Sequence, residues 1–234
     1  MIVSIVAAFA LAPQPAATSI LVFTKTAGFR HDSIPAARHA LREIGRERKW
    51  FVTTTEDATW FDGNHLKNFD AIVFLLTTGD VLNTDQEAAM KAFVNSGGGF
   101  VGVHAASDTE YEWEWYGFLV GGYFASHPPT QEAVVRIEDR RHASTSFLPK
   151  EWKRIDEWYD FKANPRPRVR VLATVDESTY DGGKMGVDHP IMWCHEFDGG
   201  RSWYTAMGHT NESYGDPLFR RMLGEGIVWA CRTR

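Results

Sequence analysis

Short apolar runs alternate with amphipathic segments along the first half of the chain. The apolar runs are rich in β-branched and aromatic residues, which is typical of buried strands, and they cover residues 19–24, 50–55, 71–77 and 99–104. Residues 33–48 and 84–97 instead repeat apolar side chains at helical spacing. Ser33 is expected to cap the first helix, and Thr84 with Glu87 predicts a capping box for the second. This alternation predicts βαβ units and a parallel sheet.

The second half of the chain has a different pattern. Its apolar runs follow one another without helices of ordinary length between them, at residues 134–137, 169–175, 191–197 and 202–207. Residues 198–201, Asp-Gly-Gly-Arg, predict a hairpin between the last two runs, and a closing helix is expected from Pro217 to Cys231. Since no repeat or low-complexity linker divides the chain, we expect a single domain over residues 19–232.

Residues 1–17 are mostly apolar and carry no charged side chain. The run 2–11 is too short to span a bilayer but suits the hydrophobic region of a signal peptide, and residues 13–17 would form a small-residue cleavage region. No Lys or Arg precedes the run, which departs from the signal pattern. We expect residues 1–17 to be a signal peptide of an exported, periplasmic protein, with a cytoplasmic protein as the alternative. No later segment predicts stable membrane insertion.

Composition narrows the classes of partner. The formal net charge of −5, without a basic cluster, argues against nucleic acid. Aromatic residues make up 13% of the chain, with nine Trp, and such side chains fill cores but also stack on sugars. Cys194 and Cys231 do not make a disulfide framework, so we expect two buried thiols, with a single bridge as the alternative in an exported protein. Homo-oligomer formation is left open.

His104 is the most informative candidate for chemistry. It ends an apolar run and is followed by small residues, so it is expected at a sharp turn at the carboxyl end of a strand, where ligands of open α/β sheets bind. The arrangement resembles a nucleophile elbow with imidazole in place of Ser or Cys, which suits acid–base chemistry or metal binding. His31 and His209 also follow predicted strands and should share this crevice. His39, His65 and His142 are expected to face solvent or the periphery.

Acidic and aromatic residues alternate in segments 111–116 and 156–160. Carboxylates hydrogen-bond sugar hydroxyls, and aromatic faces stack on sugar rings, whereas the alternative is ordinary packing with solvated acids. We predict Glu157 as a second acid–base group, with Trp158 and Tyr159 as a stacking wall. The predicted substrate-binding set is Asp108, Trp113, His127, Trp158, Tyr159 and Glu212.

Several motifs together resemble the ThuA-like (trehalose utilisation) family of the class I glutamine amidotransferase-like superfamily. They are TAGFRH at 26–31, FDAIVF at 69–74, GGGFVGVHAA at 97–106, FASHP at 124–128, DEWY at 156–159, DHP at 188–190 and YTAMGH at 204–209. They span the chain from Ser19 to Cys231. The resemblance implies a flavodoxin-like, mainly parallel α/β sheet with helices on both faces, and the strand pattern adds β hairpins in the C-terminal half.

The resemblance also bears on activity. Amidotransferase relatives have a cysteine at the elbow and a His-x-Glu pair near the C-terminus, whereas here His104 takes the elbow, and His209 with Glu212 has one extra residue of spacing. Glutamine hydrolysis is therefore not carried over. What it implies is an enzyme of carbohydrate metabolism, a hydrolase, lyase or isomerase whose substrate is a small-molecule disaccharide or keto-glycoside. We predict His31, His104, Glu157 and His209 as its catalytic residues.

Two questions stay open from the sequence. A divalent metal such as Zn²⁺ would be held by His31, His104, His127 and His209, whereas the alternative is a hydrogen-bonded cluster without metal. The rival to an enzyme is a non-catalytic sugar-binding or regulatory module on a degenerate amidotransferase-like scaffold. Paired histidines and carboxylates would favour the enzyme, and an open aromatic shelf would favour the binding module.

Overall fold

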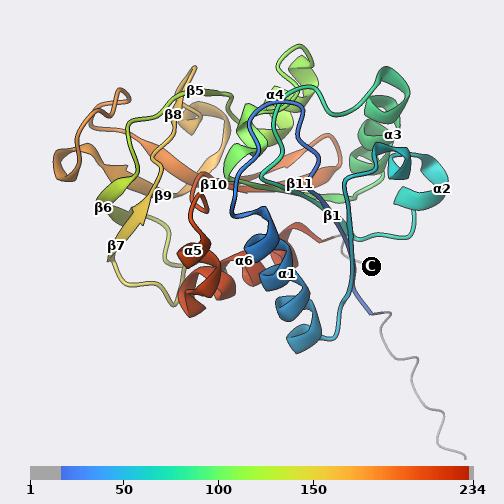
Figure 1. The fold of residues 1–234 in the computed structure, drawn as a ribbon, viewed down its shortest axis with the longest axis horizontal. Coiled ribbons are helices and arrows are strands. Elements are labelled where there is room, and N and C mark those ends of the chain that lie inside the picture. The colour runs from blue at the N-terminus through green and yellow to red at the C-terminus, as the bar shows by residue number, and fades with distance from the viewer. Residues whose placement is uncertain (1–16, 232–234) are drawn as a thin grey trace, which may run out of the picture.

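The structure is a computed structural model that describes residues 17–231, and a nine-stranded mixed sheet forms its centre. One half of the sheet is parallel, as the strand–helix alternation predicts. In spatial order its strands are β2 (Phe51–Thr55), β1 (Ser19–Phe23), β3 (Ala71–Leu75), β4 (Gly99–Val103) and β11 (Gly200–Thr205). Every residue of β3 and β4 is buried, because helices cover both faces of the sheet there (Figure 1).

The other half of the sheet is antiparallel. From β11 it continues through β10 (Pro190–Phe197), β9 (Arg170–Asp176), β6 (Gln131–Ile137) and β7 (Glu151–Asp156). The predicted hairpin joins β10 to β11, and Asp198 and Gly199 at its turn both have positive φ, 48° and 90°. A separate two-stranded sheet pairs β5 (Phe124–Ser126) with β8 (Asp160–Phe161).

Strand β7 is not predicted by the sequence pattern. Buried and exposed residues alternate along it without a break, with Trp152, Arg154 and Asp156 facing inward. This alternation marks a strand with one solvated face. The charged residues within β7 obscure the pattern in the sequence, because Arg154 and Asp156 are buried through ion pairs and hydrogen bonds instead of apolar contacts.

Helices flank the sheet on both sides. α1, α5 and α6 lie on one side, and α2, α3 and α4 on the other (Figure 1). Their bounds are α1 Ile34–Arg48, α2 Gly63–Leu66, α3 Thr84–Asn95, α4 Glu114–Val120, α5 Asn211–Gly215 and α6 Pro217–Ala230. Four short 3₁₀ turns, Ala58–Trp60, His104–Asp108, Arg166–Arg168 and Glu177–Thr179, complete the described elements.

Two predicted helix caps need correction. Ser33 precedes α1 but its side chain makes no cap hydrogen bond, because its backbone is already helical. The capping box of α3 begins one residue earlier than predicted: Asn83 accepts from the Gln86 backbone, and the Gln86 side chain accepts from the Asn83 backbone. Asn is as good an N-cap as Thr or better, so Thr84 is instead the first helical residue.

The predicted signal peptide, residues 1–17, lies outside the described residues except for its last residue, and the first strand begins at Ser19. Over residues 17–231, no helix has both the length and the apolar character needed to cross a bilayer.

His142, expected to face solvent, is buried against Trp229, and its Nδ1 lies 2.8 Å from the Ser144 hydroxyl. It is buried because the 142–148 turn packs over α6.

Candidate functional site

Three histidines from separate loops meet at the carboxyl ends of the parallel strands. His31 lies in the loop after β1, His104 directly follows β4, and His209 lies in the loop after β11. The ring centroids of His31 and His104 are 4.9 Å apart, and each of these rings is 5.3 Å from that of His209. The carboxyl ends of parallel strands share one edge of a sheet, which is why these distant positions converge.

The backbone and ring of His104 are both held in place. Its φ of +52° is in the left-handed region that non-glycine residues rarely adopt, as expected for a sharp elbow. The Tyr204 hydroxyl lies 2.8 Å from the His104 carbonyl oxygen. On the ring, Nδ1 lies 2.6 Å from the Ala206 carbonyl, which can only accept, so Nδ1 carries the proton. In the neutral ring, Nε2 therefore presents a lone pair to the cluster.

Glu157 joins the histidines from the end of β7. Its Oε2 lies 3.2 Å from His209 Nδ1 and 3.4 Å from His104 Nε2. Its Oε1 lies 3.1 Å from Nδ1 of the half-exposed His127. Burial alone would raise the pKa of Glu157, but its hydrogen bonds with His104 and His209 outweigh burial and hold the pKa well below its usual range. We call His31, His104, Glu157 and His209 the histidine cluster, since their ligand atoms all lie within 4.8 Å of one another.

The buried carboxylate of Asp156 positions Glu157 and His209 by accepting hydrogen bonds from their backbone. Its fully buried carboxylate accepts from the backbone N–H of Gly208 and of His209, at 2.9 Å each. The Glu157 N–H also donates to it, at 3.0 Å. One carboxylate thus ties the end of β7 to the loop after β11. Asp156 was not predicted as a site residue, although it lies in the DEWY motif directly before Glu157, which was the available signal for it.

The environments of His31 and His209 push their pKa values apart. Burial, reinforced by the neighbouring His104 and His209, lowers the pKa of His31 to about 3, so this ring is neutral. The hydrogen bond to Glu157 raises the pKa of His209 despite burial. Nδ1 of His31 is buried and has no hydrogen-bond partner among residues 17–231.

Tyr159 and Trp158, the predicted stacking wall, are not surface groups. Tyr159 is buried, and its ring lies 4.2 Å from the ring of His104, which it backs from inside the protein. Trp158 is buried too, and its Nε1 donates to the Gln131 carbonyl. Both residues therefore support the site instead of offering a face to a sugar.

The remaining predicted contacts are placed differently. Asp108 is half-buried on the same 3₁₀ turn as His104, and it accepts from the Tyr111 hydroxyl at 2.6 Å. Burial raises the pKa of Asp108. Trp113 stacks on Trp115 at the start of α4, and Glu212 is exposed on α5. The structure shows no contact of Trp113 or Glu212 with the histidine cluster among the described residues.

Phe29 is an aromatic residue beside the cluster that the sequence analysis missed. Its side chain is 65% exposed, and its ring meets His31 edge to face at 4.9 Å. An exposed Phe is unusual for a loop of small and polar residues, and its position two residues before His31 was the signal for it.

A second group of titratable side chains lies behind the first. Asp160, Glu177 and His189, which we call the Asp160 cluster, also bring their ligand atoms within 4.8 Å. Nε2 of His189 lies 2.8 Å from the Tyr159 carbonyl, so this cluster holds the residue whose ring backs His104.

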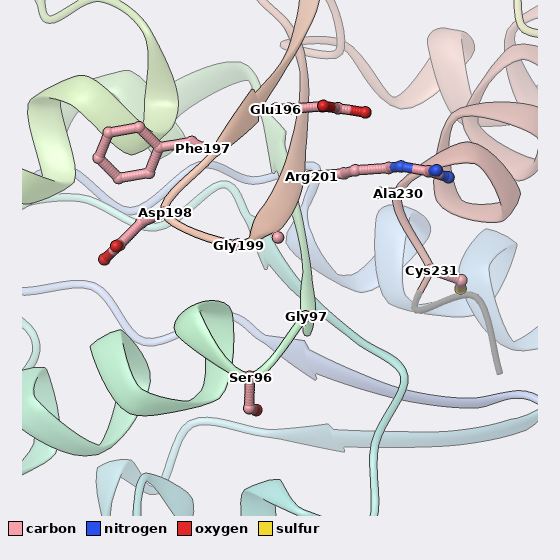
Figure 2. Close-up of a pocket in the computed structure, with 10 residues that line it drawn as sticks. Ser96, Gly97, Glu196, Phe197, Asp198, Gly199, Arg201, Ala230 and Cys231 are labelled. Atoms are coloured by element: carbon pink, nitrogen blue, oxygen red, sulfur yellow. The ribbon is translucent and has the colours of Figure 1, made fainter.

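A surface groove of about 500 Å³ lies at the opposite end of the strands (Figure 2). Gly97, just before β4, and the β10–β11 turn line it, so it is separate from His104 at the other end of β4. Cys231 is at its rim. Cys231 and the buried Cys194 are both free thiols, and burial raises the pKa of each to about 12, so neither has thiolate reactivity.

A family model described as ThuA, trehalose utilisation, matches residues 19–230. Among solved structures, a putative ThuA-like protein from Bacteroides uniformis has 22% identity and a TM-score of 0.78 over 94% of both chains. One from Parabacteroides merdae has 20% identity and a TM-score of 0.76 over 93% of this chain and 92% of that one. A β-galactosidase from Bacillus circulans has 11% identity and a TM-score of 0.56 over 92% of this chain and 30% of that one. At these identities the likeness shows the fold alone. A search of curated proteins found no match.

Proposed function

Because this chain belongs to the ThuA family, whose model describes trehalose utilisation, we propose that it is an enzyme that acts on a disaccharide or keto-glycoside by acid–base chemistry at the histidine cluster. The observation that carries the proposal is the convergence of three imidazoles and the ionised Glu157 on one point at the carboxyl edge of the sheet. A non-catalytic sugar-binding module would instead need an exposed aromatic shelf, and Trp158 and Tyr159 are buried.

The pKa values of the two carboxylates near the site are shifted in opposite directions. Hydrogen bonds with histidines outweigh burial and lower the pKa of Glu157, whereas burial outweighs the Tyr111 hydrogen bond and raises the pKa of Asp108. Such divergence is what acid–base catalysis requires. We assign Asp108 as the proton donor to a sugar oxygen, and Phe29 and His127 as outer substrate contacts.

Glutamine hydrolysis is not part of this proposal. The elbow residue is His104, and the buried thiol of Cys194 lies on β10, away from the elbow. Acyl transfer through a cysteine therefore has no nucleophile at this site.

The test is conversion of α- and β-linked glucosides and their 3-keto forms by the purified protein, followed by chromatography of the products. We expect turnover of at least one substrate by the wild type, and loss of that turnover in Asp108→Asn and His104→Ala. Binding of these sugars without turnover by the wild type would favour the binding module and overturn the proposal.

We also propose that the protein is exported, because residues 1–17 are mostly apolar and carry no charged side chain. Mass spectrometry of the protein from its native host should then find a mature N-terminus near Thr18. An intact Met1 in the cytoplasmic fraction would contradict export.

A further inference from the structure

We propose that the histidine cluster binds a divalent transition-metal ion, and that Zn²⁺ is the ion that its donor set suits best. The ligands are His104 Nε2, His209 Nδ1 and Glu157 Oε2, and His31 lies beside the remaining coordination position. The proposal rests on the proposed function for the location of the reaction centre, and it adds a cofactor to that centre.

The three ligand atoms already have the spacing of a zinc site. His104 Nε2 and His209 Nδ1 are 3.3 Å apart, and Glu157 Oε2 is 3.4 Å from the first and 3.2 Å from the second. Tetrahedral zinc with bonds of about 2.0–2.2 Å places its ligand atoms about 3.3–3.6 Å from one another. The near-equilateral triangle therefore matches one face of such a tetrahedron.

The protonation pattern also fits a cation at the centre of this triangle. His104 donates its Nδ1 proton to the Ala206 carbonyl, so in the neutral ring the lone pair of Nε2 is free to bind a metal, 3.4 Å from Glu157 Oε2. Without a metal, a second proton on Nε2 would make a hydrogen bond to Glu157, and a bound metal would replace that proton. The bond to a backbone carbonyl is the usual second interaction of a metal-binding histidine.

His31 supplies an independent observation. It is 4% exposed, and its Nδ1 has no hydrogen-bond partner among the described residues. Buried polar atoms nearly always have a partner. His142 and His195 also have a buried nitrogen without one, but of these three histidines only His31 lies in the histidine cluster, so its nitrogen is the one placed to meet a group bound there. A water or sugar oxygen on the metal would be such a group, because catalytic zinc sites keep one position open for water or substrate.

The ligand shell is rigid where a metal site needs it to be. Asp156 fixes the backbone of both His209 and Glu157, and Tyr159 lies against the ring of His104. Within the cluster, His127 Nδ1 meets only the outer oxygen of Glu157, at 3.1 Å, and it also lies 2.9 Å from the Pro128 carbonyl. It therefore lies outside the ligand set predicted from the sequence. A metal held by His104, His209 and Glu157 would supply Lewis-acid polarisation of a substrate oxygen, and Asp108 and His127 would then be the groups left to transfer protons.

Cobalt binding tests the proposal without any substrate. Metal-free protein is titrated with Co²⁺, and its visible d–d absorption, which reports tetrahedral nitrogen and oxygen ligands, is followed together with the metal content. We expect one ion per chain, a rise in the melting temperature on binding, and displacement of Co²⁺ by Zn²⁺. Glu157→Gln and His209→Ala should weaken binding by about 100-fold or more, since even outer-shell changes cost about 10–100-fold.

Two controls make the result specific. His39→Ala removes an exposed imidazole on α1, and His189→Gln removes the imidazole of the Asp160 cluster, so both should bind Co²⁺ as the wild type does. Glu157→Gln keeps the shape of the side chain, and circular dichroism shows whether each variant is folded.

The outcomes separate the two proposals. Absence of the d–d bands, or equal binding by wild type, Glu157→Gln and His209→Ala, overturns the metal site. Full sugar turnover by metal-free protein that binds no Co²⁺ also overturns it and leaves the proposed function intact. Stoichiometric binding that these two variants lose supports the metal site even where the sugar screen shows no turnover, and that screen then counts against the proposed function alone.

Discussion

The histidine cluster and the Asp160 cluster both combine histidines with carboxylates, but they differ in how many of their polar atoms have hydrogen-bond partners. In the Asp160 cluster, Asp160 accepts from the Lys184 N–H at 2.8 Å, and both nitrogens of His189 have partners at 2.8 Å, in Glu177 and the Tyr159 carbonyl. In the histidine cluster, by contrast, Nδ1 of His31 is buried and has no partner within residues 17–231.

The difference shows that residue type alone does not distinguish a functional cluster from a structural one. Whether the polar atoms of a cluster already have hydrogen-bond partners distinguishes them better. A cluster whose groups satisfy one another rigidifies the fold, whereas one with an unsatisfied member is prepared for a further group. Tyr159 connects the two, because its carbonyl accepts from His189 and its ring lies against His104. The Asp160 cluster is therefore a brace behind the reaction centre.

The largest expected effect is on activity in the histidine cluster. His104→Ala should lower kcat/KM for a converted sugar by about 10²–10⁴-fold, since it removes the central imidazole. Some loss of stability is also expected, because the buried ring packs on Tyr159 and its Nδ1 donates to the Ala206 carbonyl, so kcat/KM is compared between folded proteins. Parallel measurement of kcat/KM and thermal unfolding checks this. A folded variant with wild-type kcat/KM would remove His104 from the mechanism.

Asp156→Asn tests the link between β7 and the loop after β11. Asparagine would turn an amide donor toward backbone N–H groups, and we expect the free energy of unfolding to fall by about 3 kcal/mol, since bonds to a buried charge are worth about 1.5–3 kcal/mol each. Urea unfolding measures this change. In the protein that remains folded, kcat should also fall because His209 and Glu157 shift. Unchanged kcat would mean that Asp156 serves stability alone.

His189→Gln should lower stability more than activity, the opposite of what is expected for His104→Ala. Losing one imidazole hydrogen bond in the brace should destabilise the protein by about 1–3 kcal/mol, while kcat/KM of the folded variant stays within about tenfold of wild type. The same two assays that are applied to His104→Ala show the contrast. Loss of activity in fully folded His189→Gln would show that the two clusters work as one unit.

Phe29→Ala probes the exposed side of the histidine cluster. A stacked aromatic ring contributes about 0.5–1.5 kcal/mol, so KM should rise by about 2–12-fold with kcat nearly unchanged. Steady-state kinetics separates the two constants, and Phe118→Ala, which removes an exposed Phe on α4, is the matched control. A fall in kcat alone would place Phe29 in the chemical step instead of in binding.

The smallest effect concerns His142, which belongs to neither cluster. Burial, with help from Arg170, lowers the pKa of His142 to about 4. The unfolded chain therefore binds a proton between about pH 6.5 and pH 4 that the folded chain does not, so folding stability falls as the pH drops through this window. His142→Gln should flatten this part of the stability curve, as followed by urea unfolding at several pH values, with no change in pH dependence above pH 7.

Strong local patterns made most of the parallel half predictable. β1, β3 and β4 are continuous apolar runs, and such runs are recognisable in the sequence because a strand that is covered on both faces must be apolar throughout. The hairpin turn after β10 is recognisable from its Asp-Gly residues. β7 was missed, because its buried positions include charged residues that only tertiary partners satisfy.

The site was predictable in its centre and not in its surroundings. His31, His104 and His209 end elements of one parallel half, so topology alone brings them together. Glu157 was proposed from its aromatic neighbours, but those neighbours, Trp158 and Tyr159, are buried. Alternation of acidic and aromatic residues does not tell which side of an edge segment faces the core.

The sequence by itself determined the family, the parallel half of the sheet and the histidine at the elbow, because these depend on local periodicity and on motifs of consecutive residues. The sequence also proposed Glu157, but only the tertiary structure decided that it meets the histidines, since β7 lies at the far edge of the sheet order and the carboxylate of Asp156 ties its end to the loop of His209. It also decided which polar groups remain unsatisfied. That property depends on every neighbour in space, and no pattern along the chain records it.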